Sequence, residues 1–236
     1  MDGLILGLDL CDGYTQLSCW GREENWTLPT AVCRQKDGGW LIGETAYATA
    51  LAGEGSVTDK LIRLVLQDGS DTIYGVKYRA VELLKCFLEQ VFSLPLEEGK
   101  TVDGSMVKEL VITVPKMKAR LMDGLMYCAD QLKIPRSHVH VISHTEAFMY
   151  FVLSQTRDVW SNHVGLFDLS EKCLCYYEMK VQKNMGQVTA VAEREKLEEG
   201  FALDILSAPQ GVKLADKILC SCGERLLEKK LFSSVF

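Results

Sequence analysis

Apolar and polar residues alternate in two short runs near the start of the chain, a pattern typical of β-strands. The runs cover 4–12 and 14–21, and the turn signal Asp12-Gly13 lies at their junction. Two further extended runs follow, separated by the turn sequence KDGG. The pattern therefore predicts a β-hairpin and a β-rich first region.

Beyond residue 44 the apolar spacing alternates between that of helices and that of buried strands. Helical spacing predicts helices over 44–54, 78–95, 116–134 and 144–155. A run rich in β-branched residues predicts a buried strand over 108–115, and a further strand is expected over 138–143. This order of elements predicts an α/β fold with a right-handed crossover.

The opening pattern returns after a polar segment, 156–163, that is typical of a boundary. Residues 163–170 and 172–182 predict a second hairpin, with Asp168 near the end of its first strand as Asp9 is in the first hairpin. We interpret this repetition as internal duplication.

The chain therefore divides into two predicted domains. A first lobe over 1–160 has the β-hairpin start and a mixed sheet with helices, and a partial second lobe spans 161–236. In the second lobe we expect a strand over 187–196 and helices over 198–207 and 211–232.

Composition narrows the classes of function. A hydrophobic fraction of 47% and a charged fraction of 25% are ordinary for a globular protein. The net charge of −6, with no basic run, argues against a nucleic-acid partner. The longest apolar stretch, 147–153, is far shorter than the roughly 20 residues of a membrane span, and the chain opens without a signal peptide. We expect a cytoplasmic protein.

Nine cysteines raise the alternatives of disulfides, a metal site or free thiols. Their number is odd, no secretory signal is present, and neither Cys173 with Cys175 nor Cys220 with Cys222 has metal-binding spacing. Buried free thiols are the simpler interpretation. The three tryptophans of the first β-rich region are expected to pack over its sheet, with a partner surface as the alternative: Trp20, Trp26 and Trp40.

Several segments, in the same order along the chain, carry a resemblance to a known superfamily. They are GLDLCDGYT (7–15), LPTAV with LIGETAYATAL, TDKLIRLV (58–65), ELVITVP with the helix after it, VISHTEAFMYFVL, and VGLFDLS. Together they resemble the actin, sugar-kinase and heat-shock-chaperone ATPase superfamily. The nearest likeness is to the nucleotide-binding domain of the seventy-kilodalton heat-shock chaperones.

The resemblance implies a ribonuclease-H-like fold, complete in the first lobe and partial in the second. It implies that Asp9 and Asp168 hold Mg²⁺ and that Lys60 is a catalytic lysine; the simpler readings are a hairpin-turn acid and a solvated lysine. It also implies phosphate contacts in the two hairpins and before the next helix, at Cys11, Asp12, Gly13, Ser170, Lys172 and Gly200.

The departures from the family pattern change the expected function. Glycines of the second phosphate turn are replaced by Ser170, Glu171 and Lys172, and Asp12 adds a negative charge beside Asp9. A Cβ restricts the turn and keeps phosphate oxygens away from backbone N–H groups. In the family a Gly-Gly turn that holds adenosine follows a strand equivalent to 233–236, so whether the native chain continues past Phe236 stays open.

The leading hypothesis is a degenerate ATPase domain that does not hydrolyse ATP and serves as a binding or scaffolding module in a bacterial cytosolic assembly. We expect no cofactor and an unidentified protein partner, with self-association as a further option. The alternative is a divergent ATPase that uses ATP and Mg²⁺ and needs further C-terminal sequence. A redox or cluster-bearing activator of the same superfamily is a third reading.

Overall fold

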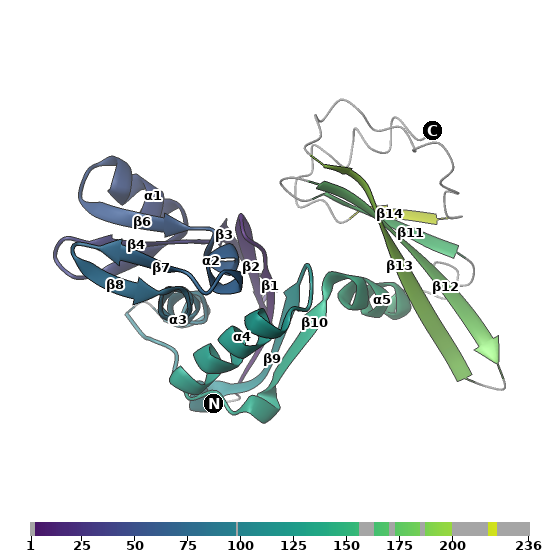
Figure 1. Cartoon of the computed structure of the whole chain (residues 1–236). Coiled ribbons are helices and arrows are strands. Elements are labelled where there is room, and N and C mark those ends of the chain that lie inside the picture. The colour runs from purple at the N-terminus through teal and green to yellow at the C-terminus, as the bar shows by residue number, and fades with distance from the viewer. Residues whose placement is uncertain are drawn as a thin grey trace. The chain divides into compact units, whose positions relative to one another are not determined.

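The computed structural model describes residues 3–97, 99–155, 163–169, 173–184, 187–199 and 217–220 (Figure 1). The chain forms two compact units, Met1–Ser143 and His144–Phe236, and each is described by itself. Within the described part of the chain, no helix combines the length and the apolar character needed to cross a membrane.

The central element of the first unit is a five-stranded mixed sheet in the order β10-β9-β1-β2-β3. Its strands are β1 (Leu4–Leu10), β2 (Tyr14–Cys19), β3 (Asn25–Pro29), β9 (Val107–Val114) and β10 (Val139–Ser143). β1, β2 and β3 form an antiparallel meander, whereas β9 pairs in parallel with both β1 and β10. The first predicted hairpin, the strands predicted over 108–115 and 138–143, and the α/β class are thereby confirmed.

Two smaller sheets complete the strands of this unit. The first has three strands in the order β5 (Trp40–Ile42), β4 (Ala31–Gln35) and β6 (Gly55–Asp59). The second is the hairpin of β7 (Ser70–Ile73) and β8 (Val76–Arg79). The sequence analysis missed β6, β7 and β8. These strands are short and rich in polar residues, and their turn, Tyr74-Gly75, has positive φ at both positions (50° and 79°) but not the usual Asn-Gly signature.

Four α-helices accompany the sheets: α1 (Gly43–Leu51), α2 (Leu61–Leu66), α3 (Ala80–Val91) and α4 (Ala119–Gln131). Two single 3₁₀ turns, Gly104–Met106 and Arg136–His138, precede β9 and β10. α3 begins at a capping box, because the Glu82 carboxylate accepts a hydrogen bond from the Arg79 N–H at 2.8 Å. The predicted helix over 78–95 therefore began too early, since residues 78 and 79 belong to β8.

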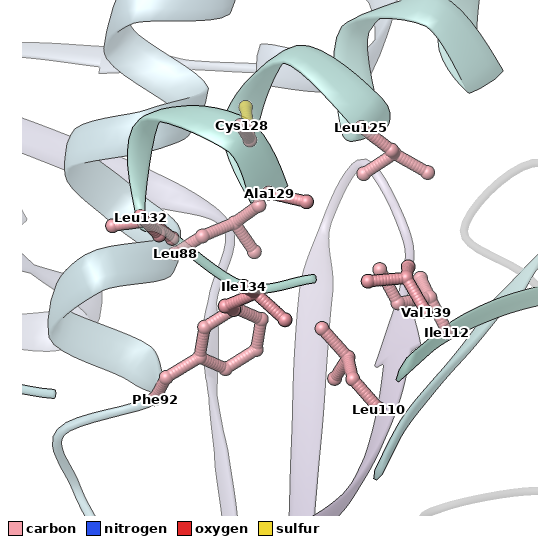
Figure 2. Close-up of a pocket in the computed structure, with 10 residues that line it drawn as sticks. All are labelled: Leu88, Phe92, Leu110, Ile112, Leu125, Cys128, Ala129, Leu132, Ile134 and Val139. Atoms are coloured by element: carbon pink, nitrogen blue, oxygen red, sulfur yellow. The ribbon is translucent and has the colours of Figure 1, made fainter. Parts of the chain in front are cut away.

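Apolar side chains of α3 and α4 pack over the sheet and form the core of the unit. The strands contribute every second residue to this core, and in β1 these residues are Leu6, Leu8 and Leu10, all fully buried. Figure 2 shows the centre of this layer, where side chains of α3, α4, β9, β10 and the segments directly after the two helices surround a closed apolar pocket of about 10 Å³. The pocket is about the size of one water but offers it no polar partner, so it is a dry packing defect.

The second unit contains α5 (His144–Ser154) and a four-stranded sheet in the order β13-β12-β11-β14. Its strands are β11 (His163–Leu169), β12 (Cys173–Asn184), β13 (Gln187–Glu199) and β14 (Lys217–Cys220). β11, β12 and β13 form an antiparallel meander, and β14 pairs in parallel with β11. The order and directions repeat those of β3-β2-β1-β9 in the first unit.

The second predicted hairpin and the strand over 187–196 are confirmed. The helix predicted over 211–232 is wrong at residues 217–220, which form β14, because a short apolar run such as KILC suits a buried strand as well as a helix. The helix predicted over 198–207 is also wrong at its first two residues, which end β13. The rest of both segments lies outside the described residues.

Candidate functional site

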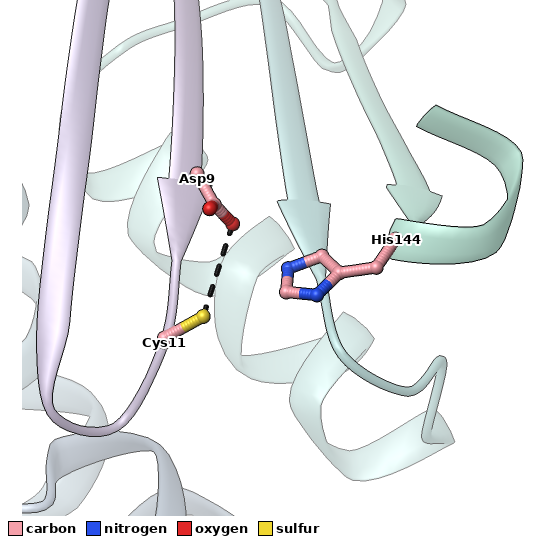
Figure 3. Close-up of side chains that lie close together, drawn as sticks. All are labelled: Asp9, Cys11 and His144. Carbon is pink, nitrogen blue, oxygen red and sulfur yellow. Dashed lines mark hydrogen bonds between the residues drawn. The ribbon is translucent and has the colours of Figure 1, made fainter. Parts of the chain in front are cut away.

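Asp9 lies at the carboxyl end of the parallel pair β1 and β9, as the last residue but one of β1. Its Oδ1 accepts a hydrogen bond from the Thr113 hydroxyl at 2.9 Å. Figure 3 shows the Cys11 thiol beside the same carboxylate, with Sγ 3.8 Å from Oδ1. The sequence analysis missed Thr113, although Asp9 and Thr113 face each other in the register of the sheet.

The other parallel strand of this edge, β10, ends at Ser143, which pairs with Val114. His144, also drawn in Figure 3, follows directly as the first residue of α5. The carboxyl ends of β1 and β9 therefore carry an acid and a hydroxyl, which are residue types suited to binding polar ligands.

Two buried threonines hold the tip of the first hairpin. The Thr30 hydroxyl donates to the Cys11 carbonyl oxygen at 2.7 Å, and the Thr30 N–H donates to the Gly13 carbonyl oxygen at 2.9 Å. The Thr15 hydroxyl lies 2.7 Å from that of Thr30 and must be the donor, because Thr30 has only one hydroxyl proton. Both threonines are almost completely buried. Cys11 and Gly13 are thus fixed through their backbone by residues that sequence reasoning missed.

Asp12, at the same tip, caps a helix that begins about fifty residues later. Its Oδ1 accepts a hydrogen bond from the Arg63 N–H at 3.1 Å, and its Oδ2 lies 3.5 Å from the Arg63 Nε. Lys60, the N-cap residue of α2, makes no side-chain cap of its own. Asp12 therefore provides the negative charge and the acceptor that the start of α2 requires.

Lys60 lies beside an open cavity of about 350 Å³ between β6, α2 and β7. Among the residues that line it are Thr58, Asp59, Lys60, Arg63, Leu64 and Asp71. The Lys60 backbone adopts the left-handed conformation (φ 53°, ψ 42°), and its side chain forms no ion pair within the described residues. The structure thus places Lys60 on a cavity of mixed charge whose lining does not include Asp9.

Asp168 occupies in β11 the position that Asp9 occupies in β1, the last residue but one. It pairs with Cys175 of β12, as Asp9 pairs with Gln16 of β2. The other predicted contacts of the second lobe lie outside the described residues: Ser170, Lys172 and Gly200.

The cysteines of the first unit are all free thiols, as predicted, and burial governs their chemistry. Burial raises the pKa of the Cys128 thiol to about 12, and it also raises the pKa of Cys33 and of the half-buried Cys86. These three thiols therefore carry very little thiolate at neutral pH and react slowly.

The three tryptophans of this unit have different surroundings. Trp26 and Trp40 pack against the core, as predicted. The Arg34 guanidinium lies 4.9 Å from the centre of the Trp40 ring, which also forms a T-shaped contact with Tyr78. The prediction is wrong for Trp20, which is 82% exposed, because it continues the alternation of β2 on the exposed face, while its N–H still donates to the Ile5 carbonyl oxygen of β1 at 2.9 Å.

The fold and this site define an α/β protein with a repeated sheet order and an acid in the same place in each sheet. The chain belongs to the family described as "Family of unknown function (DUF5716) C-terminal", which matches residues 13–236. A search of the curated proteins found no match.

Proposed function

We propose that the chain is a non-hydrolysing binding or scaffolding module built on the actin- and chaperone-like ATPase fold, acting in a bacterial cytoplasmic assembly with a protein partner. The repeated strand order supports the fold. A ribonuclease-H-like core that occurs twice requires the same meander and the same parallel partner in both units, and β3-β2-β1-β9 and β13-β12-β11-β14 share both.

The position of the Asp12 carboxylate is the observation that supports the proposed loss of ATP hydrolysis. In the superfamily that the sequence resembles, the first hairpin faces phosphate. Here the tip of that hairpin holds a carboxylate fixed by the Arg63 N–H and guanidinium. Two like charges 4 Å apart repel by about 1 kcal/mol in water and about 4 kcal/mol at an effective dielectric constant of 20.

Asp12 also has a structural role, because its carboxylate caps the start of α2. Arg63 offsets some of the repulsion, but the same contact keeps the carboxylate from moving aside. The tip as a whole is rigid, since Thr30 holds the backbone of both Cys11 and Gly13. The hairpin is therefore suited to a structural role and poorly suited to a triphosphate.

A second candidate function, a divergent Mg²⁺-dependent ATPase, is favoured by one observation. Asp9 and Asp168 occupy equivalent positions in the two sheets, as expected of a pair that holds a metal ion and phosphates between two lobes. Under this alternative, Lys60 would be the catalytic lysine.

Calorimetric titration with ATP and Mg²⁺ separates the two functions. We expect no heat of binding up to millimolar nucleotide for the wild-type chain. Micromolar binding that is lost in both Asp9→Asn and Asp168→Asn would overturn the proposal in favour of the ATPase.

Cross-linking in the native host tests the scaffolding role directly. We expect the Asp9→Asn/Asp168→Asn double variant to be cross-linked to the same protein partners, in the same amounts, as the wild type. A partner that is lost from the double variant, while the purified variant keeps the wild-type melting temperature, would show that the metal site is in use.

A further inference from the structure

We propose that the open cavity between β6, α2 and β7 binds a small dipolar molecule of the amino-acid class, with the ligand carboxylate at Lys60 and its ammonium group at Asp71. This inference does not rest on the proposed function. The cavity volume of about 350 Å³ lies within the roughly 300–1,000 Å³ typical of small-molecule sites.

The carboxylate of Asp71 is held ready for a donor from the cavity. The Thr58 hydroxyl donates to its Oδ2 at 2.6 Å, and the Thr72 N–H donates to its Oδ1 at 2.8 Å. Thr58 is buried, whereas Asp71 is only partly buried. Each carboxylate oxygen has further lone pairs, so Asp71 can accept an additional hydrogen bond from an ammonium group without giving up either donor.

The ammonium group of Lys60 provides the opposite pole. Asp59 and Asp71 line the same cavity, yet neither forms an ion pair with Lys60 in the described part of the chain. A non-glycine residue in the left-handed region costs on the order of 1 kcal/mol, and such residues cluster at ligand sites. The backbone thus fixes the origin of the lysine side chain at the N-cap of α2, beside the cavity.

Of the charged side chains that line the cavity, Arg63 forms an ion pair, with Asp12 of the hairpin. Asp59 accepts a hydrogen bond from the Tyr47 hydroxyl at 3.2 Å and has no ion-pair partner among the described residues. Lys60 and Asp71 are opposite charges in one open cavity and do not form an ion pair with each other. An α-amino acid, whose ammonium and carboxylate groups share one carbon, can pair with both side chains together, while Val57 and Leu64 offer an apolar wall for its side chain.

The test is a titration of the full ¹⁵N-labelled chain, followed by nuclear magnetic resonance, with glycine, leucine, lysine and glutamate as probes. Acetate and methylamine are matched controls, because each carries only one of the two charges. We expect at least one amino acid to shift the amide resonances of Lys60 and Asp71 at millimolar concentration, and to bind at least ten-fold more tightly than either control.

Variants test whether Lys60 and Asp71 bind the two charged groups of the ligand. Lys60→Asn removes the charge but keeps a residue that tolerates the left-handed conformation, so the fold is retained. We expect it to weaken binding at least ten-fold, and Asp71→Asn to do the same. Lys77→Gln, an exposed change on β8, is the matched control and should leave the affinity unchanged.

Two outcomes would overturn the proposal. One is that no amino acid shifts these resonances at 10 mM. The other is that acetate or methylamine binds as tightly as the amino acids, which would define a simple anion or amine site. Thr58→Val, which removes one donor to Asp71 but keeps its charge, provides a second test if Asp71→Asn does not fold; unchanged affinity in both Thr58→Val and Lys60→Asn contradicts the assignment.

Discussion

The closed pocket beneath α4 and the open cavity beside α2 are hollows of the same unit with opposite properties. Ten apolar or thiol side chains surround the first, which has a volume of about 10 Å³. The second is about 350 Å³ and exposes acids, a lysine and hydroxyl groups to water. When a side chain of the closed pocket is shortened, its packing contacts are lost. When a side chain of the open cavity is shortened, water fills the space. The closed pocket therefore serves stability, and the open cavity is free to serve recognition.

The largest difference is expected when a leucine is replaced by alanine in the closed pocket and, separately, in the open cavity. Leu125→Ala enlarges the closed pocket and should lower the free energy of unfolding by about 2–5 kcal/mol, because the new space stays dry. Leu64→Ala, also on a helix but at the wall of the open cavity, should cost less than half as much. Urea unfolding of the two variants measures the difference, and equal losses would show that the cavity beside α2 is closed to water.

A titration sharpens the same contrast, because Cys128 lines the closed pocket with a pKa of about 12. Its unfolded pKa is about 8.5, so the thiol stabilises the fold fully below pH about 8.5, and this contribution is lost as the pH rises towards 12. We expect a decrease of about 1.4 kcal/mol per pH unit above pH 9 in the wild type relative to Cys128→Ala. Unfolding free energies of both proteins at pH 8, 9 and 10 test this. Parallel pH profiles would mean that water reaches Cys128.

The smallest expected effect concerns the side of the open cavity that Asp12 and Arg63 hold in place. Asp12→Ala removes the cap of α2 and should destabilise the protein by about 1 kcal/mol. Asp12→Asn keeps the acceptor and should retain at least half of that stability. Thermal unfolding at low and high salt separates the two contributions, because only the charge is screened. A loss of less than 0.3 kcal/mol in Asp12→Ala would rule out the cap.

The sheet of the first unit could be predicted because its pattern is regular. In β1 and β9 every buried position is a leucine, an isoleucine or a valine, and the turn at Asp12-Gly13 has an ordinary signature. The hairpin of β7 and β8 could not be predicted, since its strands are mostly polar and Tyr74 begins the turn. The residues of β7 and β8 have a weak intrinsic preference for β-structure, and their tertiary environment determines that they form strands.

The acids of the candidate site, Asp9 and Asp12, could be predicted from the sequence, but the threonines around them and their contacts could not. The strand pattern indicated that Asp9 ends a strand, but the hydrogen bond from Thr113 joins residues 104 positions apart. Asp12 was expected beside phosphate, and its actual partner Arg63 is 51 positions away. Such pairings depend on the order of strands in the sheet, and no local pattern in the sequence encodes that order.

The parallel pairing of β1 with β9 also has a consequence for synthesis on the ribosome. β1 finds its antiparallel neighbour within about ten residues, but its other neighbour ends at Val114. At about 5–20 residues per second, the hundred residues between them take roughly 5–20 s to emerge. During that interval β1 is an edge strand with its backbone groups open to other nascent chains. Early release of the chain before β9 would therefore leave a fragment in which β1 is an open edge strand prone to aggregation.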